Sequence, residues 1–417
     1  MTTPAYPLHG LRVLDLSRIL AGPVCTQLLA DLGADVVKVE RPGVGDDTRQ
    51  WGPPFVDGDG LSAYYLSCNR GKRSLALDMD HAAGHAAVDD LIRRADVLVE
   101  NFLPDALAKF GLEPARLRQL NPKLVSCSIS GFGRTGPLAD VPGYDLMMQA
   151  GAGLMSITGE PAGQPMKVGV AIADVVTGLY AAVSALAGLY ARRHGDDTQA
   201  GGVAAGAAGG GMAFDLALAD CTLASLVNVV QSTLLTGQRP RRWGNAHPQI
   251  VPYEAFATAD GHLVVGIGAD RQWSRFCAAV GHSDWATDPR FATNPLRVEH
   301  REELIPLFRE LMASETTAQW QALLSTIDVP HGPVLALDEV LATPQVAARE
   351  MVTRVTDAQG RTFGLLAGAV HWQGEPPRVP RVPPELGQHT AEVLRDWLSY
   401  DEAKIAGLRK SGAIAQA

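Results

Sequence analysis

The chain has 417 residues, a length that suggests two or three domains. Its 36 basic and 45 acidic residues give a net charge of −9, which excludes the basic footprint of a nucleic-acid-binding protein and a cationic face for anionic lipid. The hydrophobic content of 46% is that of an ordinary globular protein, and no uninterrupted apolar run reaches about 18 residues. Because the N-terminus also lacks a signal-peptide pattern, we expect a cytoplasmic protein.

The first third of the chain alternates between strand and helix patterns. Residues 12–17 (RVLDLS) suit a buried strand, residues 24–32 form an amphipathic segment that stops at Gly33, and residues 35–40 (DVVKVE) are typical of the next strand. These three segments predict a parallel, right-handed βαβ unit. The pattern continues with strands at 74–78, 96–101 and 124–130 and a helix at 81–94. We therefore predict an α/β fold with a Rossmann-like parallel sheet.

A glycine-rich element follows the last of these strands. Residues 131–136 (GFGRTG) satisfy the GxGxxG pattern of dinucleotide-binding proteins. However, Pro137 comes next, Pro142 interrupts any helix, and no acidic residue ends a second strand about 20 residues later. We interpret this element as a tight turn over the sheet.

The remaining chain predicts a second, smaller α/β domain. Expected elements are a helix at 174–193, a flexible loop at 195–211, a long apolar helix at 212–235, a hinge at 238–243, a strand at 262–268, helices at 271–280, 301–313 and 317–324, strands at 353–356 and 364–370, and a helix at 389–399. The predicted large domain is 1–200, completed by 345–417. Residues 201–239 form the linker and long helix, and 240–335 the small domain.

Asp174 is the one carboxylate in the apolar run 168–176. An acid in such a setting should be partly desolvated and more reactive than a surface aspartate. The alternative is a structural role, because aspartate is a preferred N-cap before an apolar helix. Composition alone favours the structural role.

Other catalytic patterns are missing from the sequence. The five cysteines form no CxxC pair, and neither HExxH nor GxSxG occurs, so zinc sites, metal-dependent hydrolysis and serine nucleophiles lack support. Basic and polar residues instead follow the predicted strands, where α/β sheets collect ligands. This set suits an anionic ligand that carries phosphates, and it comprises Arg18, Arg41, Asn69, Lys72, Arg73, Asn101 and Lys109.

Five motifs in order resemble the class III coenzyme A transferases, the family of formyl-CoA:oxalate and carnitine CoA-transferases. They read GLRVLDLSRILAGPVCTQLLADLGADVVKVERPGVGDDTR, NRGKRSLALD, VENFLPDALAKFGL, GYDLMMQAGAGLMSITG and VAIADVVTGLYA. The resemblance covers nearly the whole chain. It implies a large Rossmann-like domain and a smaller domain in an interlocked ring homodimer that binds acyl-CoA and a small carboxylic acid, without a bound cofactor or metal.

The resemblance also implies roles for particular residues. Asp174 matches the nucleophilic aspartate of the family's D-x-x-x-G element, and Gly178 matches its glycine. CoA-contacting positions fall on Arg18, Ile19, Leu20, Ala21, Arg41, Lys72, Arg73, Asn101, Phe102, Lys109 and Tyr144. Separately from the resemblance, we expect Asn245, His247 and Gln249 to belong to a substrate site or lid that excludes water. Oxalate-specific members have glutamine at the position of Leu20 and a glycine run where this chain has His247-Pro248-Gln249, so oxalate is not the expected acceptor.

The physical chemistry agrees with a covalent transfer. A carboxylate can attack a thioester to give a mixed anhydride, and the thiolate can return to give an aspartyl-CoA thioester. Water must be kept from these intermediates. Two alternatives remain. A 2-methylacyl-CoA racemase would need histidine where Tyr144 stands, and a phenol is a poor base at neutral pH. A non-catalytic CoA-binding homologue is argued against by the intact D-x-x-x-G element.

Three segments resemble the succinyl-CoA-dependent dicarboxylate transferases, particularly the glutarate type. They are 40–55 (ERPGVGDDTRQWGPPF), 241–256 (RRWGNAHPQIVPYEAF) and 331–333 (HGP). We therefore expect CoA transfer from succinyl-CoA to a dicarboxylate. The distal carboxylate needs a cation, which Arg18, Arg73 or His247 could supply. Alternatively, both arginines bind CoA phosphates and His247 only closes its loop.

Overall fold

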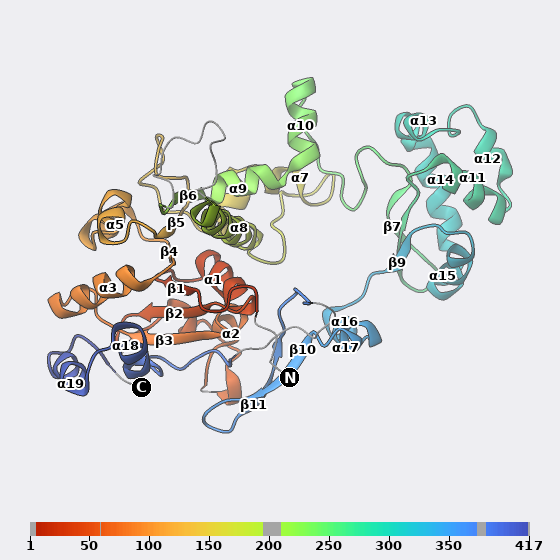
Figure 1. The fold of residues 1–417 in the computed structure, drawn as a ribbon. Helices are drawn as coiled ribbons and strands as arrows, with labels where there is room; N and C mark the ends of the chain where they lie inside the picture. The colour runs from red at the N-terminus through yellow and green to blue at the C-terminus, as the bar shows by residue number, and fades with distance from the viewer. Residues whose placement is uncertain (1–5, 59, 195–209, 373–380, 416–417) are drawn as a thin grey trace. The chain divides into compact units, whose positions relative to one another are not determined.

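The computed structural model describes residues 6–58, 60–194, 210–372 and 381–415 (Figure 1). The chain divides into two compact units. The large unit comprises Met1–Leu154, Val168–Ser232 and Pro344–Ala417, and the small unit comprises Met155–Lys167 and Thr233–Thr343. The predicted loop at 195–211 lies almost wholly outside the described residues, so its conformation stays a prediction.

A six-stranded parallel sheet forms the centre of the large unit. Its strands are β1 (Arg12–Asp15), β2 (Asp35–Glu40), β3 (Lys72–Ala76), β4 (Val97–Glu100), β5 (Val125–Ser130) and β6 (Ala213–Ala217). They lie in the order β3-β2-β1-β4-β5-β6, and every neighbouring pair is parallel. This is the strand order of a Rossmann sheet. The predicted α/β class and Rossmann-like large domain are therefore confirmed.

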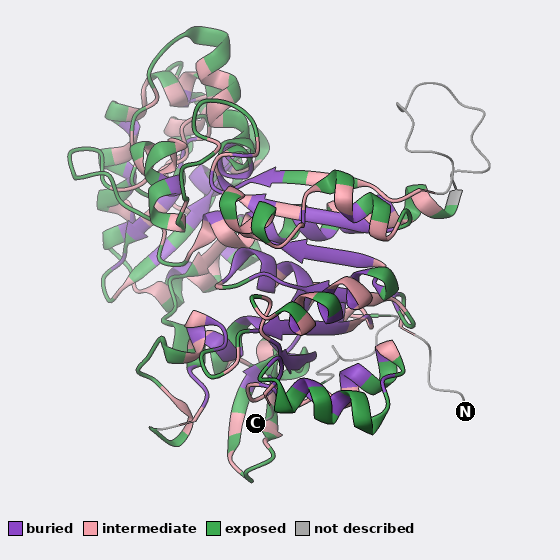
Figure 2. Cartoon of the chain, turned by 90° about the vertical axis from the view of Figure 1, so that its left-hand side faces the viewer, coloured by how far each residue is buried: buried purple, intermediate pink, exposed green. Residues whose placement is uncertain are grey.

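Helices cover both faces of this sheet because successive strand residues point to opposite sides. Val13 and Val36 join the hydrophobic cluster that includes α1 (Ala21–Asp31) and α8 (Ile172–His194). Their successors, Leu14 and Val37, join the cluster formed with α3 (Ala82–Arg94) and α18 (Thr390–Leu398). Strands β1 to β4 of this sheet are almost wholly buried (Figure 2).

The remaining elements of the large unit are shorter. They are α2 (Ala63–Cys68), α4 (Pro104–Lys109), α5 (Pro114–Leu120), α6 (Asp145–Gly151), α9 (Leu218–Ser225), α17 (Pro344–Ala348), α19 (Glu402–Lys410), two 3₁₀ turns (Asp47–Gln50 and Val56–Gly58), and the hairpin of β10 (Val352–Thr356) and β11 (Thr362–Leu366). Two helices lie at the unit boundaries, α7 (Leu154–Ile157) and α10 (Val227–Thr236).

The predicted long helix at 212–235 is wrong. Its first residues form β6, which pairs with β5 at the edge of the sheet, and the rest divides into α9 and α10, which are bent by 80°. Val227, at the break, has a positive φ of 29°. The run is apolar throughout, so its composition did not reveal that its first five residues pair with a distant strand.

The small unit has an antiparallel sheet of β7 (Tyr253–Ala257), β8 (His262–Gly266) and β9 (His331–Pro333). Its helices are α11 (Asp270–Ala279), α12 (Ser283–Thr287), α13 (Asn294–Glu299), α14 (Arg301–Ala313), α15 (Thr317–Thr326) and α16 (Leu337–Leu341). Trp273, Phe276 and Phe308 fill the core of this unit. The helices predicted here are present. The strands pair antiparallel, so this unit lacks the parallel sheet that is typical of an α/β domain.

Helix α8 is long and apolar enough to span a membrane by composition, and the bent pair α9–α10 passes the same test when taken together. Ala181, Ala182 and Ala185 of α8 are nevertheless buried in the large unit, against α1 and β5. One face of α8 thus belongs to a hydrophobic core, whereas Leu179, Tyr180 and Val183 on the same helix are exposed.

Candidate active site

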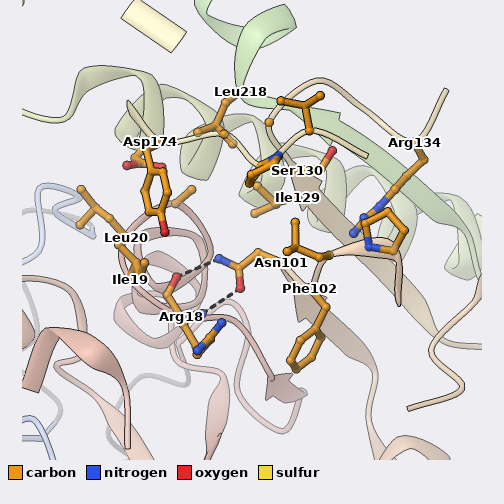
Figure 3. A pocket seen from close by; sticks show the side chains of 18 of the residues that line it. Arg18, Ile19, Leu20, Asn101, Phe102, Ile129, Ser130, Arg134, Asp174 and Leu218 are labelled. Atoms are coloured by element: carbon orange, nitrogen blue, oxygen red, sulfur yellow. Dashed lines mark hydrogen bonds between the residues drawn. The ribbon is translucent and has the colours of Figure 1, made fainter. Parts of the chain in front are cut away.

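A pocket of about 170 Å³ opens at the carboxyl ends of β1 and β4 in the large unit. These strands are neighbours in the sheet, yet their helical connections lead to opposite sides of it, and ligands of open α/β sheets bind at such a switch point. Residues that the sequence assigned to the site come from separate segments of the chain and meet in this pocket. They are Arg18, Leu20, Asn101, Phe102 and Asp174 (Figure 3), together with Tyr144. Ile19 and Ala21 line it as well.

The loop between β1 and α1 is held in place from two directions. The Asn101 side chain accepts a hydrogen bond from the Arg18 amide and donates one to the Arg18 carbonyl, both at 2.9 Å (Figure 3). The Ile19 amide donates to both carboxylate oxygens of Asp46 at 3.2–3.3 Å. Ile19 has a φ of 72°, which is costly for a β-branched residue. These bonds stabilise that backbone and fix the pocket wall.

Asp174 lies in the first turn of α8, two residues after the helix begins, so the N-cap interpretation is wrong. The capping group is Asp145, whose carboxylate accepts a hydrogen bond from the Ala173 amide at 2.8 Å. Within the described ranges, no hydrogen bond or ion pair involves the Asp174 carboxylate. Burial raises the pKa of Asp174 to about 7, and the negative charge of Asp145 adds to the increase. The pocket therefore contains an unusually basic carboxylate.

Gly178 explains how α8 approaches the loop so closely. A Cβ atom at this position would lie 2.6 Å from the Ala21 carbonyl oxygen and 3.0 Å from the Val24 Cβ atom. The absence of a side chain lets the first turns of α1 and α8 touch. The four-residue spacing thus puts Asp174 one turn before the contact point, facing the pocket.

The GFGRTG element is a turn, as predicted. Gly133 and Gly136 have φ values of 88° and 92°, and no helix follows directly. A Cβ atom on Gly131 would lie 2.7 Å from the Gly143 Cα atom, so two segments of backbone cross at the pocket wall. The pattern therefore serves close backbone approach here, not a dinucleotide.

Arg134, inside this turn, is a pocket residue that the sequence interpretation missed. Its guanidinium donates to Ser128 at 2.9 Å and to Glu100 at 3.2 Å, while Nη1 is buried and has no hydrogen-bond partner in the described part of the chain. Its position three residues into a turn after β5 was the available signal, because the same argument selected Arg18 after β1.

A second cavity of about 320 Å³ adjoins the first, since Arg18 and Phe102 line both. Arg41 also lines it, and Lys109 pairs at 2.5 Å with Asp80, another residue of its wall. Arg18 pairs with Asp47 at 3.3 Å, and both side chains are exposed. Three of the cations predicted for CoA, Arg18, Arg41 and Lys109, thus lie at or near this cavity. The acidic partners of Arg18 and Lys109 are exposed, so a phosphate could replace them.

Lys72 and Arg73 lie elsewhere. The assignment of both residues to CoA, and of Arg73 to a distal carboxylate, is corrected. Lys72 is fully buried, and its ammonium donates at 3.0 Å to Asp15, to Asn69 and to the Pro23 carbonyl. Asn69, itself buried, is likewise part of this internal network. Arg73 is bound by Asp35, Glu392 and Asp396. Because all three donors of the Lys72 ammonium are used inside the protein, none is left for a ligand.

Asp15 is the centre of the buried network around Lys72. Besides Lys72, it accepts hydrogen bonds from the hydroxyls of Ser17 and Thr26 at 2.5 and 2.7 Å. Burial alone would raise the pKa of Asp15, but Lys72, Lys38 and the two hydroxyls outweigh it and lower the pKa to about 2. Asp15 is therefore a permanent anion that ties β1 to β3.

The substrate or lid residues Asn245, His247 and Gln249 belong to the small unit. His247 Nδ1 accepts a hydrogen bond from the Gln249 amide at 3.0 Å, and burial and the charge of Arg301 lower the pKa of His247. Its imidazole is therefore neutral at pH 7 and is a poor choice for the cation that holds a carboxylate. Among the residues described, no cluster of three or more His, Cys, Asp or Glu side chains could hold a metal ion.

The sequence matches a known protein family over most of its length. The family model "CoA-transferase family III" matches residues 8–390. The chain belongs to this family. The resemblance predicted from the five motifs is confirmed, as is the assignment of the chain to a family of CoA-transferases.

Named relatives extend the comparison to whole chains. A succinate–glutarate CoA-transferase of Agrobacterium fabrum is 46% identical over 400 residues, covering 94% of this chain and 95% of that protein. A succinyl-CoA:glutarate CoA-transferase of Mus musculus is 39% identical, covering 98% and 91%. The crystal structure of a CAIB/BAIF family protein from Brucella suis is 40% identical with a TM-score of 0.79, covering 94% of this chain and all of that one. This family member therefore has named counterparts along nearly its full length.

Proposed function

We propose that this family member transfers coenzyme A from succinyl-CoA to a dicarboxylic acid such as glutarate, with Asp174 as the nucleophile. The observation that carries the proposal is the Asp174 carboxylate itself, which lies in the switch-point pocket with a pKa of about 7 and no partner cation in the described ranges. Desolvation makes a carboxylate more basic and more nucleophilic. The relatives named for succinate–glutarate transfer support the choice of substrates.

The proposed reaction begins when one Asp174 oxygen attacks the thioester carbonyl carbon of succinyl-CoA. The carbon–sulfur bond breaks, the thiolate leaves, and a mixed anhydride joins Asp174 to succinate. The thiolate then attacks the aspartyl carbonyl, which releases succinate and leaves an aspartyl-CoA thioester. A glutarate carboxylate then attacks the aspartyl-CoA thioester, which frees the thiolate and gives a mixed anhydride of Asp174 and glutarate. The thiolate attacks the glutaryl carbonyl of this anhydride, which releases glutaryl-CoA and restores the Asp174 carboxylate. Each step exchanges one acyl bond for another, so no oxidant, metal or added proton is required.

The pocket supports this sequence in two ways. The fixed loop of Arg18 and Ile19 and the carboxamide of Asn101 form a rigid wall beside Asp174, which limits the misplacement of reacting atoms. Apolar Leu20, Ile129 and Leu218 also line the pocket and would limit the access of water to the anhydride. The cavity that adjoins this pocket, with Arg18 and Arg41, would hold the phosphates of coenzyme A.

Racemisation of a 2-methylacyl-CoA is the competing reaction. It needs a base on each side of the α-carbon, and the residue opposite Asp174 would be Tyr144, whose side chain is exposed. The phenol does not provide a base at neutral pH. No observation on the described residues favours this reaction over transfer.

The assembly and location follow from the same proposal. We infer a homodimer, with the subunits interlocked as in the family resemblance, in the cytoplasm. Exposed apolar side chains on the large unit support this inference. They are Leu179, Tyr180 and Val183 on α8, Leu223 on α9 and Val227 on α10. Large exposed apolar patches on a folded unit commonly mark interfaces.

The test is a trapping experiment on the full-length protein. With succinyl-CoA and hydroxylamine, Asp174 should be converted to its hydroxamate, found by mass spectrometry of the peptide containing 168–191, with loss of activity. Product analysis with glutarate and with butyrate then tests the acceptor class. If an active preparation contains no modified Asp174, covalent transfer is refuted. Equal rates with glutarate and butyrate would refute the dicarboxylate assignment.

A further inference from the structure

A third cavity, of about 330 Å³, lies entirely within the small unit. Four arginines and two glutamates line it, in a protein whose net charge is −9. One of the arginines, Arg309, is neutralised by Glu254 through two hydrogen bonds at 2.7 and 3.1 Å. The other three arginines outnumber the remaining glutamate, Glu302, so the cavity has a net positive charge.

Arg241 and Arg301 are the notable pair, because both guanidinium groups stack on one indole. Their central carbons lie 3.7 and 4.2 Å from the ring centroid of Trp243. The Arg301 guanidinium also donates to the backbone carbonyls of His247 and Pro248, which carry no charge to offset it. In the described ranges neither arginine forms an ion pair. Stacking on an aromatic ring leaves the edge of a guanidinium free to bind a carboxylate.

The rest of the cavity wall is less polar. Ile250, Ile305 and Pro306 contribute apolar surface beside the cations. A short dicarboxylic acid has the matching pattern, with methylene groups between two charged ends. His247, also in the wall, does not supply the charge, because its Nδ1 already accepts the Gln249 amide and it lies next to Arg301.

We propose that the Arg241–Trp243–Arg301 stack is a binding site for a carboxylate group of a small dicarboxylic acid. The choice of a dicarboxylate rests on the proposed function, whereas the anion site itself rests on the two guanidinium groups without ion pairs. Phosphate groups of coenzyme A share the required charge, so the experiment has to separate the two sources.

The test measures binding of glutarate and of 3′,5′-ADP to the full-length protein by isothermal titration calorimetry. Arg241→Gln is the main variant, because Arg241 makes no hydrogen bond within the described ranges and its loss should leave the fold intact. We expect glutarate affinity to fall about tenfold or more, the usual effect of removing a charge-assisted bond. Binding of 3′,5′-ADP should be unchanged. Arg275→Gln is the matched control. This substitution removes the same charge from the same unit, but Arg275 lies outside the cavity.

Arg301→Gln should reproduce the glutarate effect, and Arg241→Lys should restore only part of it, because lysine keeps the charge but not the planar stack. Unchanged glutarate affinity in both Arg241→Gln and Arg301→Gln would overturn the proposal. So would loss of 3′,5′-ADP binding with glutarate binding preserved. Trapping of Asp174 by hydroxylamine in these variants reports on the proposed function independently, because that assay uses saturating succinyl-CoA and no glutarate.

Discussion

Two aspartates of the large unit, Asp15 and Asp174, have opposite properties because their surroundings differ. Asp15 is completely buried but is met by an ammonium group and two hydroxyls, so its pKa falls to about 2. Asp174 is less buried, but its carboxylate has no such partners among the described residues and stands near another acid, so its pKa rises to about 7. Burial thus identifies neither role. The groups that meet the carboxylate make Asp15 structural and Asp174 reactive.

The largest effect is expected from Asp174→Ala. If this carboxylate is the nucleophile, CoA transfer should fall by about a thousandfold or more, because no other group can form the acyl intermediate. Succinyl-CoA binding and the folded structure should persist, since the side chain makes no hydrogen bond or ion pair within the described ranges. Steady-state kinetics would measure transfer, and calorimetric titration would measure succinyl-CoA binding. Turnover near that of the unmodified protein would contradict the reactive role given to Asp174.

The second prediction concerns stability. Asp15→Asn should lower the free energy of unfolding by about 3–5 kcal/mol at pH 7, because it leaves the buried Lys72 ammonium without its counter-charge. Urea unfolding followed by circular dichroism would measure the change. Glu402→Gln is the control, because its ion pair with Arg395 is exposed and should contribute less than about 1 kcal/mol. Equal costs for the two variants would show that the Asp15 network is not a structural centre.

The smallest effect is expected from Asp145→Asn, which alters the charge next to Asp174. The amide oxygen can still accept the Ala173 hydrogen bond, but the like charge that helps raise the pKa of Asp174 is removed. Since the carboxylate form attacks, kcat/KM rises with pH as Asp174 loses its proton. The acidic limb of the profile should therefore move to lower pH in this variant. A limb that stays in place or moves upward would remove Asp145 from the explanation.

Much of the large unit could be predicted from the sequence because its information is local. Strands β1, β2 and β4 are short, buried and mostly apolar segments, and β3 and β5 are buried segments that also contain polar residues. Glycine, proline or polar residues separate them, and this pattern is typical of a parallel sheet. Strand β6 was missed because nothing in its five residues distinguishes it from the helix that follows. Its identity depends on pairing with β5, about 87 residues earlier.

The site shows the same division. Asp174 was found because it is a single acid within an apolar run, a feature visible in the sequence itself. Arg73 was wrongly assigned because its partners, Glu392 and Asp396, are more than 300 residues away and convert an apparent ligand into an internal contact. Asp145 was also missed as the helix cap, since it acts on α8 from 28 residues before Ala173. A charged residue after a strand is a candidate ligand only if the fold leaves it unoccupied.

The raised pKa of Asp174 also carries a cost for the folded state. The folded value of about 7 exceeds the ordinary aspartate value, so the charged carboxylate is less stable in the pocket than in the unfolded chain, and stability is lost as pH rises from about 4 to about 7. A neutral asparagine at this position would avoid the loss. Directed evolution that selects only for heat resistance at neutral or higher pH would therefore favour chains that can no longer perform the reaction.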